Sequence, residues 1–175
     1  MNIKGVVIAF FMVVLTMAGN ALADIRDTYD YASSCPQSPN KTDKWGFATC
    51  NCTSYAADKM NEHDVHLNNY NWPKKGFHWG NAYEWIKAAQ AAQAAKLAGI
   101  TYNTSPKHRD IAWWPASDST KWLGHVAYVE SVDSKGNITV SEYNFEHKYD
   151  YGHGTRAIKK GSSSYPKYFI HFGAK

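Results

Sequence analysis

The sequence is short of several features that mark special classes of protein. Its 175 residues include only 6 prolines and 12 glycines, which excludes collagen-like and low-complexity chains. The formal net charge is +4, which suits an anionic surface such as a cell wall or a membrane but is too weak to indicate binding of nucleic acid. Aromatic residues are abundant at 15%, which excludes an intrinsically disordered chain. These values predict one ordinary folded domain.

Only one stretch is both long and hydrophobic, and it lies at the start of the chain. Lys4 precedes an almost unbroken apolar run over residues 5–17, and Ala21-Leu22-Ala23 forms an A-x-A cleavage box. This combination is typical of a secretory signal peptide. The alternative, an uncleaved membrane anchor, would prefer about 20 apolar residues. We therefore expect cleavage after Ala23, export to the periplasm or the medium, and no stable membrane insertion afterwards.

Cysteine is scarce, with 3 residues at positions 35, 50 and 52. An odd number in an exported chain leaves one thiol without an intramolecular partner. A single residue separates Cys50 from Cys52, which is poorly suited to an unstrained mutual disulfide. The sequence therefore predicts a bridge from Cys35 to either Cys50 or Cys52. The remaining thiol is a buried structural cysteine, an intermolecular bridge or a reactive group, depending on what surrounds it.

The order of the predicted elements indicates an α+β fold. After a polar extension over residues 24–44, the domain is expected over residues 45–175. Helical patterns cover residues 51–60, with Asn51 as the N-cap, and residues 81–98, ended by Gly99. Runs of β-branched and aromatic residues then predict strands over residues 110–114, 124–132, 137–143, 155–159 and 168–172. Helices followed by an antiparallel sheet define the α+β class.

The central two strands form a predicted hairpin with its loop over residues 133–136. This register places Val129 opposite Val140 and Ser131 opposite Ile138, so that one face of the hairpin is apolar. A slip of one residue would destroy the apolar matching, which supports the register.

At the far end of the hairpin, the same face carries three polar residues. The register places His125 opposite Asn144, with Glu142 beside them. A histidine at a strand end can take the proton of a thiol, and a carboxylate or amide on the next strand can orient the imidazole. A helix N-terminus favours a thiolate, and Cys52 lies in the first turn of the predicted helix. The alternative is a surface histidine at a sheet edge and a capped cysteine.

Several short motifs resemble, in order and spacing, those of the CHAP domain, the family of cysteine, histidine-dependent amidohydrolases/peptidases. They are Cys-Thr-Ser-Tyr-Ala at 52–56, Trp-Gly-Asn-Ala at 79–82, Asp-Ile-Ala at 110–112, Gly-His-Val-Ala-Tyr-Val-Glu at 124–130 and Ser-Glu-Tyr-Asn at 141–144. The resemblance covers roughly residues 45–172. It implies a papain-like fold in which N-terminal helices pack on an antiparallel sheet.

The resemblance also implies roles for individual residues. Cys52 would be the nucleophile and His125 the general base and then the general acid. Glu142 would orient the imidazole and stabilise its positive charge, and Asn144 would support the same histidine. Asn51 stands where the family often has a glutamine that helps to bind the oxyanion. This is a departure that shifts part of that task to the backbone N–H of Cys52.

The same resemblance implies how the cysteines pair and which cofactors, metals and substrate contacts are expected. A bridge from Cys35 to Cys50 would fix the loop before the nucleophile and leave Cys52 free. No cofactor is expected. Some family members bind calcium through aspartates just before the cysteine, but only Asp43 stands there, so no metal site is expected. Trp79 and Trp114 are candidate platforms for the substrate, although core packing is an equal alternative for both.

The function implied by the resemblance is hydrolysis of an amide bond in peptidoglycan by a secreted monomer. The bond is either the one between muramic acid and L-alanine or one within the stem peptide. Two alternatives remain, which are a non-catalytic module that binds the cell wall and a secreted toxin or antigen with the same fold.

Overall fold

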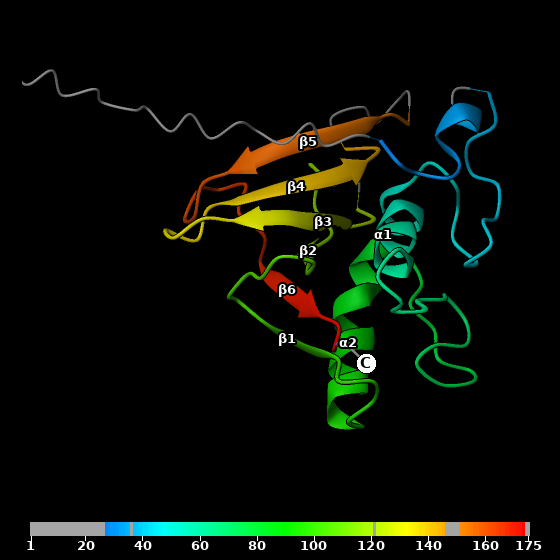
Figure 1. The fold of residues 1–175 in the computed structure, drawn as a ribbon, viewed down its shortest axis with the longest axis horizontal. Coiled ribbons are helices and arrows are strands. Elements are labelled where there is room, and N and C mark those ends of the chain that lie inside the picture. The colour runs from blue at the N-terminus through cyan, green and yellow to red at the C-terminus, as the bar shows by residue number, and fades with distance from the viewer. Residues whose placement is uncertain (1–26, 36, 121, 146–150, 174–175) are drawn as a thin grey trace, which may run out of the picture.

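The computed structural model describes residues 27–35, 37–120, 122–145 and 151–173, so the predicted signal peptide lies outside the described residues. The described chain has the predicted α+β class, with helices packed beside one sheet (Figure 1). Its helices are α1 (Cys52–Asn61) and α2 (Trp85–Ala94), and its short 3-10 segments are η1 (Ala32–Ser34) and η2 (Ala82–Glu84). No helix within the described ranges is long and apolar enough to cross a membrane.

The sheet has 6 strands in the order β1-β6-β2-β3-β4-β5, and every neighbouring pair is antiparallel. The strands are β1 (Thr101–Asn103), β2 (Ile111–Trp114), β3 (His125–Val132), β4 (Ile138–Tyr143), β5 (His153–Ile158) and β6 (Tyr168–His171). In Figure 1, α1 lies beside the start of β3, whereas α2 lies next to β1 and β6. The sheet therefore meets the N-terminus of α1 near the start of its central strand.

Both faces of the sheet are buried by apolar side chains. Successive side chains of β3 point to opposite faces of the sheet, as in any strand. Val126 and Tyr128 pack with the helices and with the fully buried Trp79 and Trp85. On the opposite face, Val129 packs with residues of the neighbouring strands. Each fully buried side chain of this kind contributes about 1.5–3 kcal/mol to the free energy of folding.

The predicted hairpin register is right at one end and wrong at the other. Val129 faces Val140 as expected, but a bulge between Val129 and Ser131 shifts the pairing by one residue. Ile138 therefore pairs with Val132 and not with Ser131 as predicted. The side chain of Ser131 is exposed. The bulge thus replaces a polar side chain on the apolar face with a hydrophobic one.

The turn of the hairpin explains the shift. Residues 133–137 lie between β3 and β4, one residue more than the predicted loop over 133–136, and the backbone N–H of Asp133 donates to the carbonyl oxygen of Asn137 at 2.9 Å. The Asp133 Oδ1 accepts the backbone N–H groups of Lys135 and Asn137 at 2.8 and 2.9 Å. An aspartate side chain that bonds to the backbone ahead of it favours such a turn, and it is this bonding that the sequence pattern did not resolve.

The second helix ends earlier than predicted. Instead of reaching residue 98, α2 ends at Ala94, and Lys96 takes the left-handed backbone conformation (φ 52°) expected of a glycine in this position. Its N–H bonds to the carbonyl of Gln93 at 3.0 Å, and the N–H of Leu97 bonds to that of Ala92 at 2.9 Å. This pair of bonds is a Schellman motif, which ends the helix so that Leu97 can pack against the core.

Candidate active site

The thiol of Cys52 stands at the first residue of α1 and is partly exposed. The chain reaches it through a tight turn, because Cys50 has a left-handed backbone conformation (φ 65°) and Asn51 is extended. The N–H of Cys50 is held by the hydroxyl of Tyr29 at 3.0 Å. The first N–H groups of a helix have no partner within it, so Cys52 lies where positive electrostatic potential and free donors are available.

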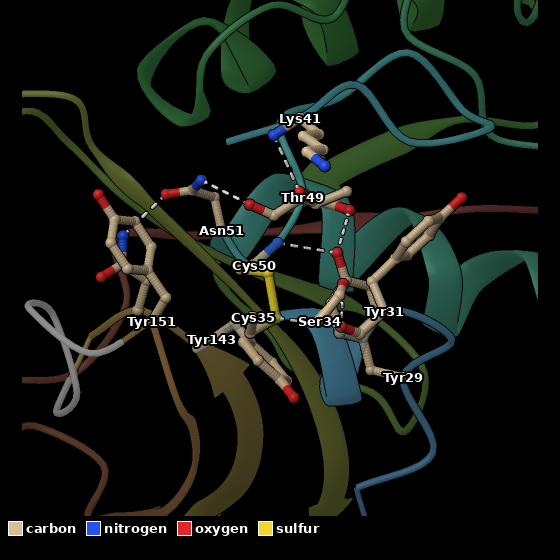
Figure 2. The surroundings of a disulfide bond; sticks show 12 residues. Tyr29, Tyr31, Ser34, Cys35, Lys41, Thr49, Cys50, Asn51, Tyr143 and Tyr151 are labelled. Carbon is tan, nitrogen blue, oxygen red and sulfur yellow. Dashed lines mark hydrogen bonds between the residues drawn. A yellow bond between two sulfur atoms is a disulfide. The ribbon is translucent and has the colours of Figure 1, made fainter. Parts of the chain in front are cut away.

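A disulfide joins Cys35 to Cys50 and ties this turn to the preceding segment (Figure 2). Both sulfur-bearing residues are buried in a small cluster with Tyr29, Tyr55 and Tyr143. Cys52 remains a free thiol. The cross-link therefore anchors the chain two residues before the thiol without consuming it.

Asn51 makes other contacts than those expected of it. It occupies the N-cap position of α1, but its side chain does not cap the helix. Its amide nitrogen instead donates to the Asn40 Oδ1 at 2.7 Å and to the Thr49 carbonyl oxygen at 3.0 Å, the latter visible in Figure 2. Both amide hydrogens are thereby used, so the side chain does not offer a donor to an oxyanion. The backbone N–H of Cys52, in the first turn of α1, stays a candidate donor to an oxyanion.

Asn144 also departs from its expected place. Its backbone has a left-handed conformation (φ 57°) just after β4, and its side-chain nitrogen donates to the Asn51 Oδ1 at 2.7 Å. Among the described residues, the Asn144 side chain bonds to the loop that carries the thiol, and no hydrogen bond joins it to His125. Its own oxygen is buried and accepts no hydrogen bond from the described residues.

His125 is buried at the start of β3, and its Nε2 lies 2.8 Å from the Glu142 Oε2. The ring is flanked by Trp114 and Phe145, at centroid distances of 5.6 and 4.7 Å. Because Nε2 is engaged with the carboxylate, Nδ1 is the nitrogen left to face Cys52, whose sulfur interacts with the imidazole through charge and hydrogen bonding.

The glycine before His125 permits a close approach of two segments. Gly124 has φ 71°, and a Cβ there would lie 2.6 Å from the backbone nitrogen of Tyr83. That nitrogen donates to the carbonyl oxygen of Leu123 at 2.8 Å. A side chain at position 124 would therefore push η2 away and displace the start of β3, which carries His125.

The two buried groups shift each other's titration. Burial by itself lowers the pKa of His125, but the charge and hydrogen bond of the Cys52 sulfur, together with the Glu142 carboxylate, outweigh it and raise the pKa to about 9. Burial raises the pKa of Glu142, but His125 and Arg156 outweigh that effect and hold it below its usual value. The arrangement thus favours an imidazolium beside the sulfur and an ionised carboxylate behind it.

Arg156 on β5 is a residue that the sequence pattern did not reveal. Its Nε donates to the Glu142 Oε1, and its Nη2 donates to the Glu142 Oε2 at 3.0 Å. Arg156 therefore binds both oxygens of the Glu142 carboxylate, which has no exposed surface. Its guanidinium lies 4.0 Å from the ring centroid of Phe145 and 5.3 Å from that of Trp114. A signal was present, because a carboxylate buried in a sheet needs a nearby cation, and Arg156 lies on the adjacent strand.

The two candidate tryptophans have different surroundings. Trp79 is fully buried, and its indole N–H donates to the carbonyl oxygen of Trp72 at 2.9 Å. The expectation that Trp79 contacts substrate is therefore wrong, because its ring is part of the core. Trp114 is half-buried beside His125, with its N–H on the carbonyl oxygen of Ser164 at 2.9 Å, so it stays a candidate.

Asp43 is used inside the fold. Its Oδ1 accepts the backbone N–H groups of Trp45 and Phe47, each at 2.8 Å, and its Oδ2 accepts the hydroxyl of Ser54. Burial raises the pKa of this carboxyl. Across the part of the chain that the structure describes, no group of three or more histidine, cysteine, aspartate or glutamate side chains is placed to hold a metal ion.

Comparison with known proteins identifies the family. The family model of the CHAP domain matches residues 42–144. The chain belongs to the CHAP domain family. This match spans Cys52, His125, Glu142 and Asn144, so the first three residues, which meet in the structure, all lie inside the CHAP domain.

Staphylococcal proteins are among the relatives of this CHAP domain. Staphylococcal secretory antigen ssaA2 of Staphylococcus aureus is 37% identical over 113 residues, which cover 65% of this chain and 33% of that protein. Staphylococcal secretory antigen SsaA of the same species is 36% identical over 107 residues, which cover 61% of this chain and 31% of that protein. The chain thus matches about a third of the length of these curated relatives.

A solved structure shows the same fold. An N-acetylmuramoyl-L-alanine amidase from Staphylococcus aureus superposes with a TM-score of 0.52 and 22% sequence identity, over 73% of this chain and 31% of that one. At this identity the likeness concerns the fold of the CHAP domain.

Proposed function

We propose that this protein is a secreted peptidoglycan hydrolase that cleaves an amide bond by cysteine nucleophile chemistry. One observation carries the proposal. Cys52, at the N-terminus of α1, interacts with the imidazole of His125, and the Nε2 of that imidazole is hydrogen-bonded to the buried Glu142. A thiol, a base and a group that orients the base are the parts that acyl transfer requires.

In the first half of the reaction, the Cys52 sulfur attacks the carbonyl carbon of the amide. The oxyanion that forms accepts a hydrogen bond from the backbone N–H of Cys52, because the Asn51 side-chain amide already donates to Asn40 and Thr49. The carbon–nitrogen bond then breaks, and the leaving amine takes the proton held on His125 Nδ1. The product remains on the enzyme as a thioester.

In the second half, water replaces the amine. His125 takes a proton from the water as the oxygen attacks the thioester carbon, and the sulfur leaves. The acid is released and the thiol–imidazole pair is restored. Glu142, held by Arg156, keeps the imidazole oriented through both halves and stabilises its positive charge.

The class of substrate is supported by the relatives. A structural neighbour is named an N-acetylmuramoyl-L-alanine amidase, and two sequence relatives are named secretory antigens. The bond is the one between muramic acid and L-alanine or one within the stem peptide. The predicted signal peptide over residues 1–23 and the buried disulfide both fit export to an oxidising compartment.

The test compares the chain, without its leader, with its Cys52→Ala variant on purified sacculi. We expect the parent to clear the sacculi and the variant to lose clearing while still sedimenting with them. Mass spectrometry of the released fragments identifies the bond. A matched control is Ser134→Ala, which makes a similar small truncation in the exposed turn between β3 and β4 and leaves the thiol.

Each outcome has a clear reading. If the Cys52→Ala variant still clears the sacculi, Cys52 is not the nucleophile. Sedimentation of the parent without cleavage of sacculi from any source would favour a non-catalytic wall-binding module, the alternative from another functional class.

A further inference from the structure

A hollow of about 340 Å³ lies beside the loop that carries the thiol. It is lined by Thr53, which follows Cys52, and by Asn40 and Ala48, which both bond to the side chain of Asn51. Its other wall comes from the segment between α1 and α2 and includes Asn69, Tyr70, His78, Gly80, Asn81 and Glu84. The hollow therefore joins the entry to α1 with the start of η2, outside the His125 side of the site.

Glu84 is the acidic side chain of this hollow. Among the described residues that line it, no lysine or arginine is present to neutralise the carboxylate. The Glu84 Oε2 accepts the backbone N–H of Asn81 at 2.8 Å as part of a capping box, whereas Oε1 accepts no hydrogen bond from the described part of the chain. One oxygen thus fixes the side chain and the other is available to a ligand.

The position of the carboxylate depends on a neighbouring glycine. Gly80 has φ 69°, and a Cβ there would lie 2.3 Å from the Glu84 Oε2. The Gly80 N–H is held by the Asn69 Oδ1 at 2.8 Å. The absence of a side chain at Gly80 leaves the space in which the Glu84 carboxylate rests.

We infer that this hollow is a subsite for the ammonium group of a peptide ligand, with Glu84 as its counter-ion. The inference rests on the proposed function and deepens it, because peptidoglycan stem peptides contain a diamino acid with a free or cross-linked side-chain amine. A fixed carboxylate with one free oxygen binds an ammonium through a charge-assisted hydrogen bond. The stacked rings of Tyr70 and His78, with centroids 5.2 Å apart, form an exposed wall for the aliphatic part of that residue.

This arrangement gives the protein a means to select its substrate. A free amine would be accepted, whereas an amine converted to an amide by cross-linking or acetylation carries no charge for Glu84 to bind. The hollow therefore favours stem peptides that are not cross-linked through that amine.

The test measures binding without cleavage, so that it does not depend on the reaction. The Cys52→Ala variant is titrated calorimetrically with a muramoyl tripeptide that ends in lysine, and with the same peptide acetylated on the lysine side-chain nitrogen. We expect the free amine to bind about tenfold more tightly, a difference of about 1.4 kcal/mol. Adding Glu84→Gln should abolish this preference while leaving affinity for the acetylated peptide unchanged.

The substitution is chosen to spare the fold, because glutamine also completes a capping box. Glu62→Gln, at the exposed C-cap of α1, makes the same chemical change away from the hollow and should keep the preference. Equal binding of the two peptides, binding of neither, or a preference that survives Glu84→Gln would overturn the inference. Failure of the parent protein to cleave sacculi, with the Glu84-dependent preference present, would instead reject the proposed hydrolase and keep the subsite.

Discussion

The two sides of the candidate active site are held in place by different forces. The thiol side, residues 27–60, is mostly loop, and it is fixed by a disulfide and by hydrogen bonds that involve tyrosine and asparagine side chains. The imidazole side, strands β3 to β5, is regular sheet, and it is fixed by the buried ionic group of His125, Glu142 and Arg156.

The difference follows from what each side has to position. A loop has no ladder of backbone hydrogen bonds, so a covalent bond two residues before Cys52 limits its conformations. A sheet already fixes its backbone, so only the side chains of His125 and Glu142 need to be oriented. Charges in a buried site do this strongly, because they are little screened there. Substitutions on the sheet side should therefore lower catalysis strongly, whereas those at the disulfide should lower stability with little effect on catalysis.

The largest effect is expected for Glu142→Gln. It removes the charge that orients His125 and leaves the half-buried Arg156 without its partner, so kcat should fall by about 1000-fold and the free energy of unfolding by about 3 kcal/mol. Cleavage of a purified muropeptide and thermal unfolding measure both. Glu130→Gln is the control, since its carboxylate accepts the hydroxyl of Ser141 and does not touch His125.

Arg156→Met should lower kcat by roughly 100-fold, because Glu142 and His125 lose their fixed geometry. Loss of the cation also raises the pKa of Glu142, so the acid limb of the pH–rate profile should move to higher pH. Since the folded pKa of Glu142 is depressed, its stabilisation is present above its unfolded pKa and is lost as pH falls through the folded one.

The control for Arg156 is Lys159→Met, an exposed cation just after β5. Arg156→Lys should recover part of the activity, since it restores the charge but not the two-point contact. An unchanged pH profile in Arg156→Met would show that Arg156 has only a structural role.

Alkaline pH tests the pair of His125 and Cys52. Activity should persist to a pH of about 9 and then fall, because the pKa of His125 is raised to about 9 from its ordinary value of 6.5. A raised folded pKa contributes stability below the unfolded value, which is lost as pH rises from about 6.5 to about 9. In Cys52→Ala the pKa of His125 should drop, as measured by NMR titration of the imidazole. A basic limb near pH 6.5 in the parent would contradict the pairing.

The smallest effect on catalysis is expected at the disulfide. Replacing both Cys35 and Cys50 with alanine opens a loop of 15 residues and should lower the free energy of unfolding by about 3 kcal/mol. The melting temperature should then fall by roughly 6–12 °C. Below the melting range, kcat should change far less than in Glu142→Gln. A loss of activity as large as in that variant, with the fold intact, would show that the cross-link positions the thiol directly.

Much of the fold and part of the site could be predicted from the sequence. The strand pattern identified the hairpin and the register of Val129 with Val140, because both faces of β3 are buried and alternate. It missed the bulge and the early end of α2, since these depend on the hydrogen bonds of Asp133 and on the packing of Leu97. Propensity carries little information about either.

What the sequence by itself determined is the set of chemical groups and the elements that carry them. The motifs place Cys52 at a helix start and His125 and Glu142 on paired strands, since local patterns specify local structure. Only the tertiary structure decided which groups touch. It placed Arg156 on Glu142, turned Asn144 to Asn51 and buried Trp79, because such contacts depend on the relative positions of residues distant in the chain.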